Sequence, residues 1–230
     1  MKWRSLEEAA VAEDARSLRE QFAGRKELIA KYVPPGIQAI HARAVAQLKE
    51  KGIVDHAPSE GATAPHFALH DHNGKPLSSA DLLHKGRMVI CFFRGRWCPF
   101  CVGQLEAMSL IVPQIERCQA SLIAISPQTV QQSFFMADQH KLRFPLLSDP
   151  GNRVARQFGL AYRVPDDQEK VYRQVFINLP FVNGDETWEL PVPATYILDR
   201  DGSVIYASVN PDYAERPEPS EILQRLTMLN

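Results

Sequence analysis

The sequence is poor in cysteine and has almost no net charge. Four cysteines in 230 residues are too few for the disulfide framework of a small secreted protein, so we expect a reducing, cytoplasmic setting. The 26 basic and 27 acidic residues give a formal net charge of -1, which leaves no overall field to attract nucleic acid or an anionic membrane. A small, uncharged or weakly charged substrate is the natural expectation.

Long apolar runs are also missing. No run approaches the ~18 apolar residues that cross a membrane, and acidic residues interrupt positions 1–10, where a signal peptide would have its apolar core. Neither a membrane span nor a secretory leader is expected. With 45% hydrophobic and 23% charged residues, the composition is typical of a soluble globular protein with one main domain and an appendage.

Residues 1–58 are predicted to form a helical extension. Apolar residues recur there at the spacing of one helical face, at Ile37, Ile40, Ala44 and Leu48, and Gly52 stands where this helix should end. The extension could be a packing appendage or the arm of a homodimer. The sequence leaves both open.

Residues 59–230 alternate between strand and helix patterns. Strands are expected at 65–69, 88–93, 121–126, 144–147, 195–198 and 204–209, the last two as a hairpin, with helices after residue 98 and at 128–140 and 152–158. An insert at about 160–192 is too long for an ordinary connection and is a lid, a partner-facing element or a surface excursion. The pattern predicts an α/β fold, a mixed sheet with helices on both faces.

A C-x-x-C pair, Cys98 and Cys101, lies between the apolar run 88–93 and the next helix. A sulfur at a helix N-terminus meets unpaired N–H groups and the positive end of the helix dipole, which stabilise a thiolate. Cys101 continues the buried helix face, so we expect an exposed Cys98 to attack and Cys101 to resolve. Arg94 and Arg96 would add positive potential beside Cys98, and Trp97 would flank its sulfur.

These cysteines have two other interpretations. A zinc site needs four ligands, usually from two such pairs, and Cys91, Cys118 and the histidines at 66, 70 and 72 are poor substitutes, so no metal is expected. Inert core cysteines are the other interpretation, which we adopt for Cys91 and Cys118. A Trp-Cys-Pro-Phe-Cys junction is an unusual place for passive packing.

Several motifs occur in the order found in peroxiredoxins. They are Ala64-Pro65-His66-Phe67-Ala68-Leu69, the strand into Cys98, Ala124-Ile125-Ser126-Pro127, Phe144-Pro145-Leu146-Leu147-Ser148-Asp149 and Val154-Ala155-Arg156-Gln157-Phe158-Gly159. The match covers about 60–212. The run ending at Cys101 and the segment 190–196 resemble bacterial peroxiredoxin-like proteins of the AhpC/TSA group that carry a thioredoxin-type C-x-x-C.

This resemblance implies a thioredoxin-like, peroxiredoxin-type domain without a cofactor. Cys98 would take the peroxidatic position, reducing hydrogen peroxide or an organic hydroperoxide and becoming a sulfenic acid. Cys101 is the candidate resolving thiol, and thioredoxin or a similar reductant would reduce the resulting disulfide. A thiol already adjacent traps a sulfenic acid efficiently.

Two positions depart from the family pattern. Peroxiredoxins have Thr or Ser where this chain has Gly95, and an Arg near the position of Pro193, which instead resembles the cis-proline of thioredoxins beside the C-x-x-C. Arg94 or Arg96 could replace the missing Arg. The first hypothesis is therefore a thiol peroxidase. The alternatives are a thiol-disulfide oxidoreductase with a disulfide substrate, and a non-enzymatic interaction module.

Overall fold

The computed structural model describes residues 16–228 of the chain. Its helices are α2 (Leu18–Tyr32), α3 (Pro35–Glu50), α4 (Ser79–Lys85), α5 (Pro99–Leu110), α6 (Val112–Arg117), α7 (Val130–Gln139), α8 (Arg153–Gln157), α9 (Asp166–Gln174), α10 (Leu179–Asn183) and α11 (Pro219–Thr227), with short 3-10 helices η1 (Ile53–His56) and η2 (Pro150–Asn152). Its strands are β1 (Ala68–Asp71), β2 (Pro76–Ser78), β3 (Arg87–Phe92), β4 (Ala120–Ser126), β5 (Leu146–Ser148), β6 (Ala161–Arg163), β7 (Glu189–Pro191), β8 (Ala194–Leu198) and β9 (Val204–Val209).

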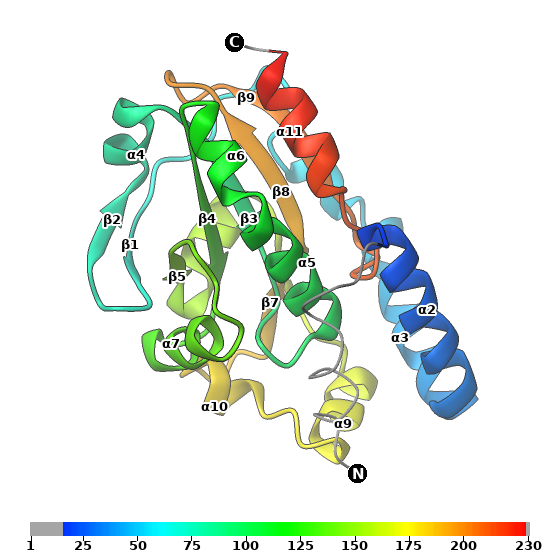
Figure 1. The fold of residues 1–230 in the computed structure, drawn as a ribbon. Coiled ribbons are helices and arrows are strands. Elements are labelled where there is room, and N and C mark those ends of the chain that lie inside the picture. The colour runs from blue at the N-terminus through cyan, green and yellow to red at the C-terminus, as the bar shows by residue number, and fades with distance from the viewer. Residues whose placement is uncertain (1–15, 229–230) are drawn as a thin grey trace.

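A seven-stranded mixed sheet runs through the molecule in the order β2-β1-β5-β4-β3-β8-β9 (Figure 1). β3, β4 and β5 are parallel, and the pairs β3–β8, β8–β9, β1–β5 and β1–β2 are antiparallel. The parallel strands are joined by helical crossovers and the last two strands by a hairpin. The predicted α/β fold is therefore confirmed.

The central strand β3 is buried on both faces because successive side chains of a strand point in opposite directions. Val89 and Cys91 belong to the core that includes α5, α6 and α11, whereas Met88, Ile90 and Phe92 belong to the core that includes α4 and α8. Packing on both faces fixes the position of the C-terminal end of β3. The loop that carries the cysteines begins at that end.

Most predicted elements are present, but the first strand lies further along the chain than expected. Phe67 donates its N–H to the Ser79 hydroxyl at 3.0 Å and accepts the Ser79 N–H at 2.9 Å, so ladder pairing begins only at Ala68. The Asp71 carboxylate accepts two N–H groups of the turn that follows. The break between α5 and α6 falls beside Pro113, which has no backbone N–H to donate and fits only the first turn of a helix.

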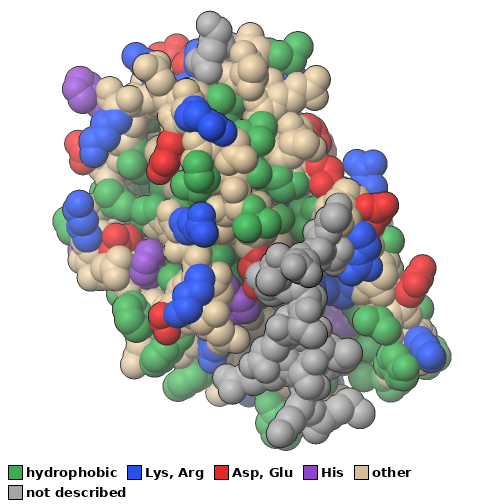
Figure 2. Space-filling model, viewed as in Figure 1, with side chains coloured by type: hydrophobic (Ala, Val, Ile, Leu, Met, Phe, Trp, Pro, Cys, Tyr) green, Lys and Arg blue, Asp and Glu red, His purple; other side chains and the backbone are tan. Residues whose placement is uncertain are grey.

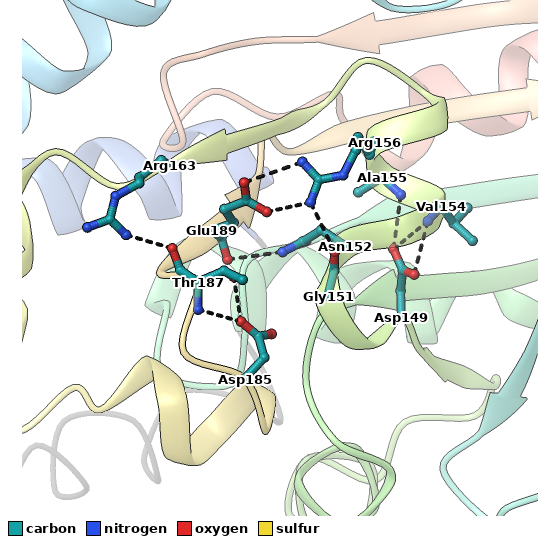
Figure 3. Close-up of polar contacts among 10 residues, drawn as sticks. All are labelled: Asp149, Gly151, Asn152, Val154, Ala155, Arg156, Arg163, Asp185, Thr187 and Glu189. Carbon is teal, nitrogen blue, oxygen red and sulfur yellow. Dashed lines mark hydrogen bonds and ion pairs between the residues drawn. The ribbon is translucent and has the colours of Figure 1, made fainter.

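The insert is an ordered unit with a base and a small core of its own. β6 and β7 pair antiparallel at its base, and a cluster that includes Tyr172 and Trp188 fills it. Figure 3 shows its anchor to the helix before it: Arg156 pairs with the Glu189 carboxylate at 2.6 Å, and the Asn152 amide donates to the Glu189 carbonyl at 3.1 Å. Arg163 also donates to the Thr187 carbonyl. These contacts fix the base of the insert in place.

The N-terminal helices pack against their own chain. α2 lies against α5, where the rings of Phe22 and Phe100 meet edge to face at 5.1 Å, and α3 lies against α9. A side chain at Gly103 would meet Phe22 at 3.0 Å. Glu218, from the segment before α11, accepts the Leu18 and Arg19 N–H groups at 3.1 and 2.7 Å. The described part of the extension, residues 16–58, therefore packs into the domain's core, whereas residues 1–15 lie outside the described residues. The role of the extension as a dimer arm stays a prediction.

Acidic and basic side chains are mixed over the face shown in Figure 2. This agrees with the nearly balanced composition. Of the helices within residues 16–228, none combines the length and apolar character needed to cross a bilayer.

Replacing Phe22 with alanine is expected to lower the free energy of unfolding by about 3 kcal/mol, because the ring is 4% exposed and its loss leaves a cavity against α5. Chemical denaturation monitored by circular dichroism measures this. Phe134→Ala is the matched control, since the Phe134 ring is 47% exposed. Equal midpoints for Phe22→Ala and the native protein would contradict the packing role of α2.

Candidate active site

The loop between β3 and α5 brings the two cysteines together. Cys98 is the N-cap residue of α5, and Pro99 takes the first helical position, where no N–H partner is needed. Cys101 follows one turn later on the same side of the helix. The two sulfurs lie 3.0 Å apart as free thiols, so a small approach would bring them to the ~2.05 Å of a disulfide bond.

Both thiols are buried, which corrects the expectation of an exposed Cys98. The Cys98 side chain is 1% exposed and that of Cys101 is 0% exposed. Aromatic residues from three parts of the chain surround the start of α5: the ring centroid of Trp97 lies 5.2 Å from that of Tyr172 of α9, and Phe100 lies 5.9 Å from Tyr213, which follows β9. The sequence pattern of α5 alone cannot reveal a cover that other elements supply.

Arg94 is the buried cation of the site. Its Nη1 lies 4.0 Å from the Cys98 sulfur, its Nη2 donates to the Tyr172 hydroxyl, and its backbone N–H donates to the Cys101 sulfur at 3.5 Å. The guanidinium lies over the rings of Trp97 and Tyr213, at 4.8 and 4.3 Å from their centroids. Among residues 16–228, no carboxylate forms an ion pair with it. A thiolate is the anion that this cation can stabilise.

A second cation, Arg216, was not found from the sequence. It lies after β9, and its Nη2 reaches the Cys101 sulfur at 3.5 Å while its Nε donates to Gln104 at 2.8 Å. Gln104 is 1% exposed on a helix whose other buried residues are mostly apolar. A glutamine on this largely apolar part of α5 is the feature of the sequence that indicates a polar partner for the helix.

The surroundings of the two thiols shift their pKa values in opposite directions. Burial raises the pKa of Cys98, and the adjacent Cys101 raises it further. Burial acts in the same direction on Cys101, but the hydrogen bond from Cys98 and the positive charges of Arg216 and Arg94 outweigh it and lower the pKa to about 5. The pair therefore shares one negative charge between its two sulfurs, beside the positive charges of Arg94 and Arg216.

The other predicted site residues lie at different places. Arg96 does not join the sulfurs: it is exposed, its N–H donates to Gln128 at 2.6 Å, and its Nε donates to Gln132 at 2.8 Å. Pro193 is buried between β7 and β8, and all described peptide bonds are trans, so the expected thioredoxin-like cis-proline is wrong. The adjacent Val192 N–H is already bonded to the Leu160 carbonyl at 2.8 Å, which ties this segment to the insert.

Gly95 has a structural reason to lack a side chain. Its φ of 148° is rarely adopted by other residues, and a Cβ there would lie 2.6 Å from the indole Nε1 of Trp97. The indole N–H therefore occupies the space that a side chain at position 95 would need. Trp97 Nε1 and Arg94 Nε are both buried donors without a hydrogen-bond partner among the described residues. Within the same residues, no group of three or more His, Cys, Asp or Glu could hold a metal ion.

A family model for the AhpC/TSA family matches residues 61–207. The chain belongs to the AhpC/TSA family. A chloroplastic peroxiredoxin Q of Sedum lineare is 30% identical over 172 residues, 74% of this chain and 79% of that protein. The chloroplastic peroxiredoxin Q of Arabidopsis thaliana is 29% identical over 154 residues, 67% of this chain but only 61% of that protein.

Solved structures place this AhpC/TSA protein in the peroxiredoxin fold. The peroxidoxin BcpB of Mycobacterium tuberculosis has a TM-score of 0.59 at 22% identity, covering 75% of this chain and 99% of that one. A more distant relative in sequence is the thiol-disulfide oxidoreductase ResA of Bacillus cereus, 23% identical over 168 residues, 73% of this chain and 78% of that protein. Family and relatives together support a thiol peroxidase, with disulfide exchange as the minor alternative.

Replacing Arg94 with methionine is expected to move the thiolate titration of the pair upward by about one pH unit, because a positive charge beside both sulfurs is lost. Native Cys101 should hold its charge down to about pH 5 and lose it below that value. Ultraviolet thiolate absorbance against pH measures the midpoint. Arg96→Met is the control, since Arg96 bonds Gln132 instead. Superimposable curves for Arg94→Met and the native protein would refute the electrostatic role.

Proposed function

We propose that this AhpC/TSA protein is a thiol peroxidase in which Cys98 reduces a hydroperoxide and Cys101 closes a disulfide. The observation that carries the proposal is the pair of sulfurs 3.0 Å apart beside a buried arginine that has no carboxylate partner among the described residues. The burial of both thiols favours a small substrate, because a protein disulfide could not reach them without displacing the aromatic cover. Hydrogen peroxide or a small organic hydroperoxide meets that condition.

The proposed reaction begins when the proton of Cys98 leaves its sulfur. The Cys101 thiolate, 3.0 Å away, accepts this proton, and the Cys98 thiolate attacks the terminal peroxide oxygen. The O–O bond breaks, Cys98 becomes a sulfenic acid, and the departing alkoxide or hydroxide takes the proton back from Cys101. Arg94 Nε and the Trp97 indole N–H are the unpartnered donors available to hold the peroxide.

The second step joins the two sulfurs. The Cys101 thiolate attacks the sulfenic sulfur of Cys98, the S–O bond breaks, and the leaving hydroxide takes a proton from solvent to become water. Two electrons from an external dithiol then regenerate the pair. Thioredoxin or a similar reductant is the proposed donor, and the aromatic cover must move to admit it.

Mixing the reduced protein with a slight excess of hydrogen peroxide is expected to form a Cys98–Cys101 disulfide, detected by mass spectrometry after stopped-flow oxidation. Cys98→Ser should consume peroxide no faster than a free thiol, and Cys101→Ser should stop at the sulfenic acid. Cys118→Ser, which alters a partly exposed cysteine outside the pair, is the matched control. Equal slow consumption by the native protein and Cys98→Ser would eliminate the peroxidase.

Thiol-disulfide exchange is the second candidate, favoured by the C-x-x-C pair and the likeness to ResA. Insulin reduction distinguishes it, because a peroxidase with a covered pair should act on insulin slowly. The Cys101→Ser variant would trap a mixed disulfide with a true exchange partner. Rapid insulin reduction without peroxide consumption would make exchange the main activity.

A homodimer through the N-terminal helices and a cytoplasmic setting are part of the same proposal. Leu28 and Tyr32 of α2 are 48% and 69% exposed, so they are available to a second copy. A Leu28→Glu, Tyr32→Glu variant is expected to halve the molar mass measured by light scattering. If the native protein is already a monomer, or if the variant keeps the mass of the native dimer, α2 does not act as a dimer arm. Phe176→Glu, on the insert, provides the control for a general loss of surface apolar area.

A further inference from the structure

A different guanidinium group contacts each sulfur. Arg94 Nη1 lies 4.0 Å from the Cys98 sulfur, and Arg216 Nη2 lies 3.5 Å from the Cys101 sulfur. The two cations reach the pair from different parts of the chain, Arg94 from the loop after β3 and Arg216 from the segment between β9 and α11. This arrangement suggests separate tasks for the two side chains.

The half-buried Arg216 side chain is held in its orientation by hydrogen bonds. Its Nε donates to the Gln104 amide oxygen at 2.8 Å, and the Gln104 amide nitrogen donates to the Thr195 hydroxyl at 3.0 Å. Gln104 and Thr195 are each 1% exposed, so this relay is shielded from water. The Arg216 Nη1 donates to the Glu215 carbonyl at 2.7 Å. A guanidinium fixed on both sides keeps one N–H free for the sulfur.

The neighbouring segment is tied to the N-terminal extension. Lys26 of α2 pairs with the Glu215 carboxylate, and Glu218 caps the start of the same helix. Arg216 stands between these two attachment points. Its place beside Cys101 is therefore built by contacts on both flanks and is not left to a free loop.

We propose that Arg216 is a catalytic residue of the second step, in which it activates Cys101 against the oxidised Cys98. It stabilises the Cys101 thiolate while that sulfur displaces hydroxide from the Cys98 sulfenic acid and forms the S–S bond. In the return reaction an external thiolate attacks Cys98, the S–S bond breaks, and the electron pair leaves with Cys101, again beside Arg216. The sulfenic acid in this inference rests on the proposed function, whereas the contact between Arg216 and Cys101 rests on the geometry alone.

Single-turnover oxidation of Arg216→Met by hydrogen peroxide tests this assignment. Sulfenic acid is trapped with dimedone, the disulfide is counted by mass spectrometry, and the two rates are compared with those of the native protein. Removing a charge-assisted contact worth about 1.5 kcal/mol or more should slow disulfide closure about tenfold beyond any effect on sulfenic acid formation. Arg216→Lys, which keeps the charge, should recover part of the loss.

Two further variants keep the result clear. Gln104→Met preserves the side-chain volume but removes the relay, and it should slow closure in the same direction as Arg216→Met. Arg200→Met, at the turn between β8 and β9, changes an exposed arginine and should match the native rates. Closure at the native rate in Arg216→Met would overturn the proposal, and so would an equal slowing of both steps.

A measurement without peroxide separates this inference from the peroxidase itself. In a Cys98→Ser background, the pH midpoint of Cys101 alkylation by iodoacetamide is expected to rise by about one unit when Arg216→Met is added, for the same electrostatic reason. Equal midpoints with and without Arg216→Met would refute the role of Arg216 whatever the protein's substrate. Native protein that is inert to peroxide but shows the alkylation difference would refute only the peroxidase.

Discussion

A buried guanidinium that lacks a carboxylate needs another negative charge beside it, and this requirement shapes the site. Arg94 lies among aromatic rings and beside the Tyr172 hydroxyl, which hold it but do not neutralise it. The cysteine pair supplies the charge because one of its two protons leaves readily. The arginine and the thiolate therefore stabilise each other, and the aromatic cover strengthens their attraction by excluding water.

The cover also explains why the N-terminal extension and the insert belong to one functional unit. α2 brings Phe22 against Phe100, and α9 brings Tyr172 against Arg94. Neither element carries a reacting atom, yet both pack against the residues around the start of α5. Elements from two distant parts of the chain therefore complete the surroundings of the cysteine pair.

The sequence predicted what depends on neighbouring residues. The C-x-x-C at the start of a helix, the hairpin of β8 and β9 and the helix ending at Gly52 follow from local patterns, and the structure confirms them. The burial of Cys98 could not be predicted, because the covering residues come from other elements. Arg216 lies 115 positions from Cys101, and no pattern of spacing connects them.

The cap that Glu218 places on α2 links residues 200 positions apart, Leu18 and Glu218. During synthesis on a ribosome, α2 emerges long before Glu218 and lacks this carboxylate until the segment after β9 has been made. The same late segment supplies Arg216 to the Cys101 sulfur and the Tyr213 ring to Arg94. The cysteines, their first cation and α2 are therefore all completed by one short stretch of chain that is made after them.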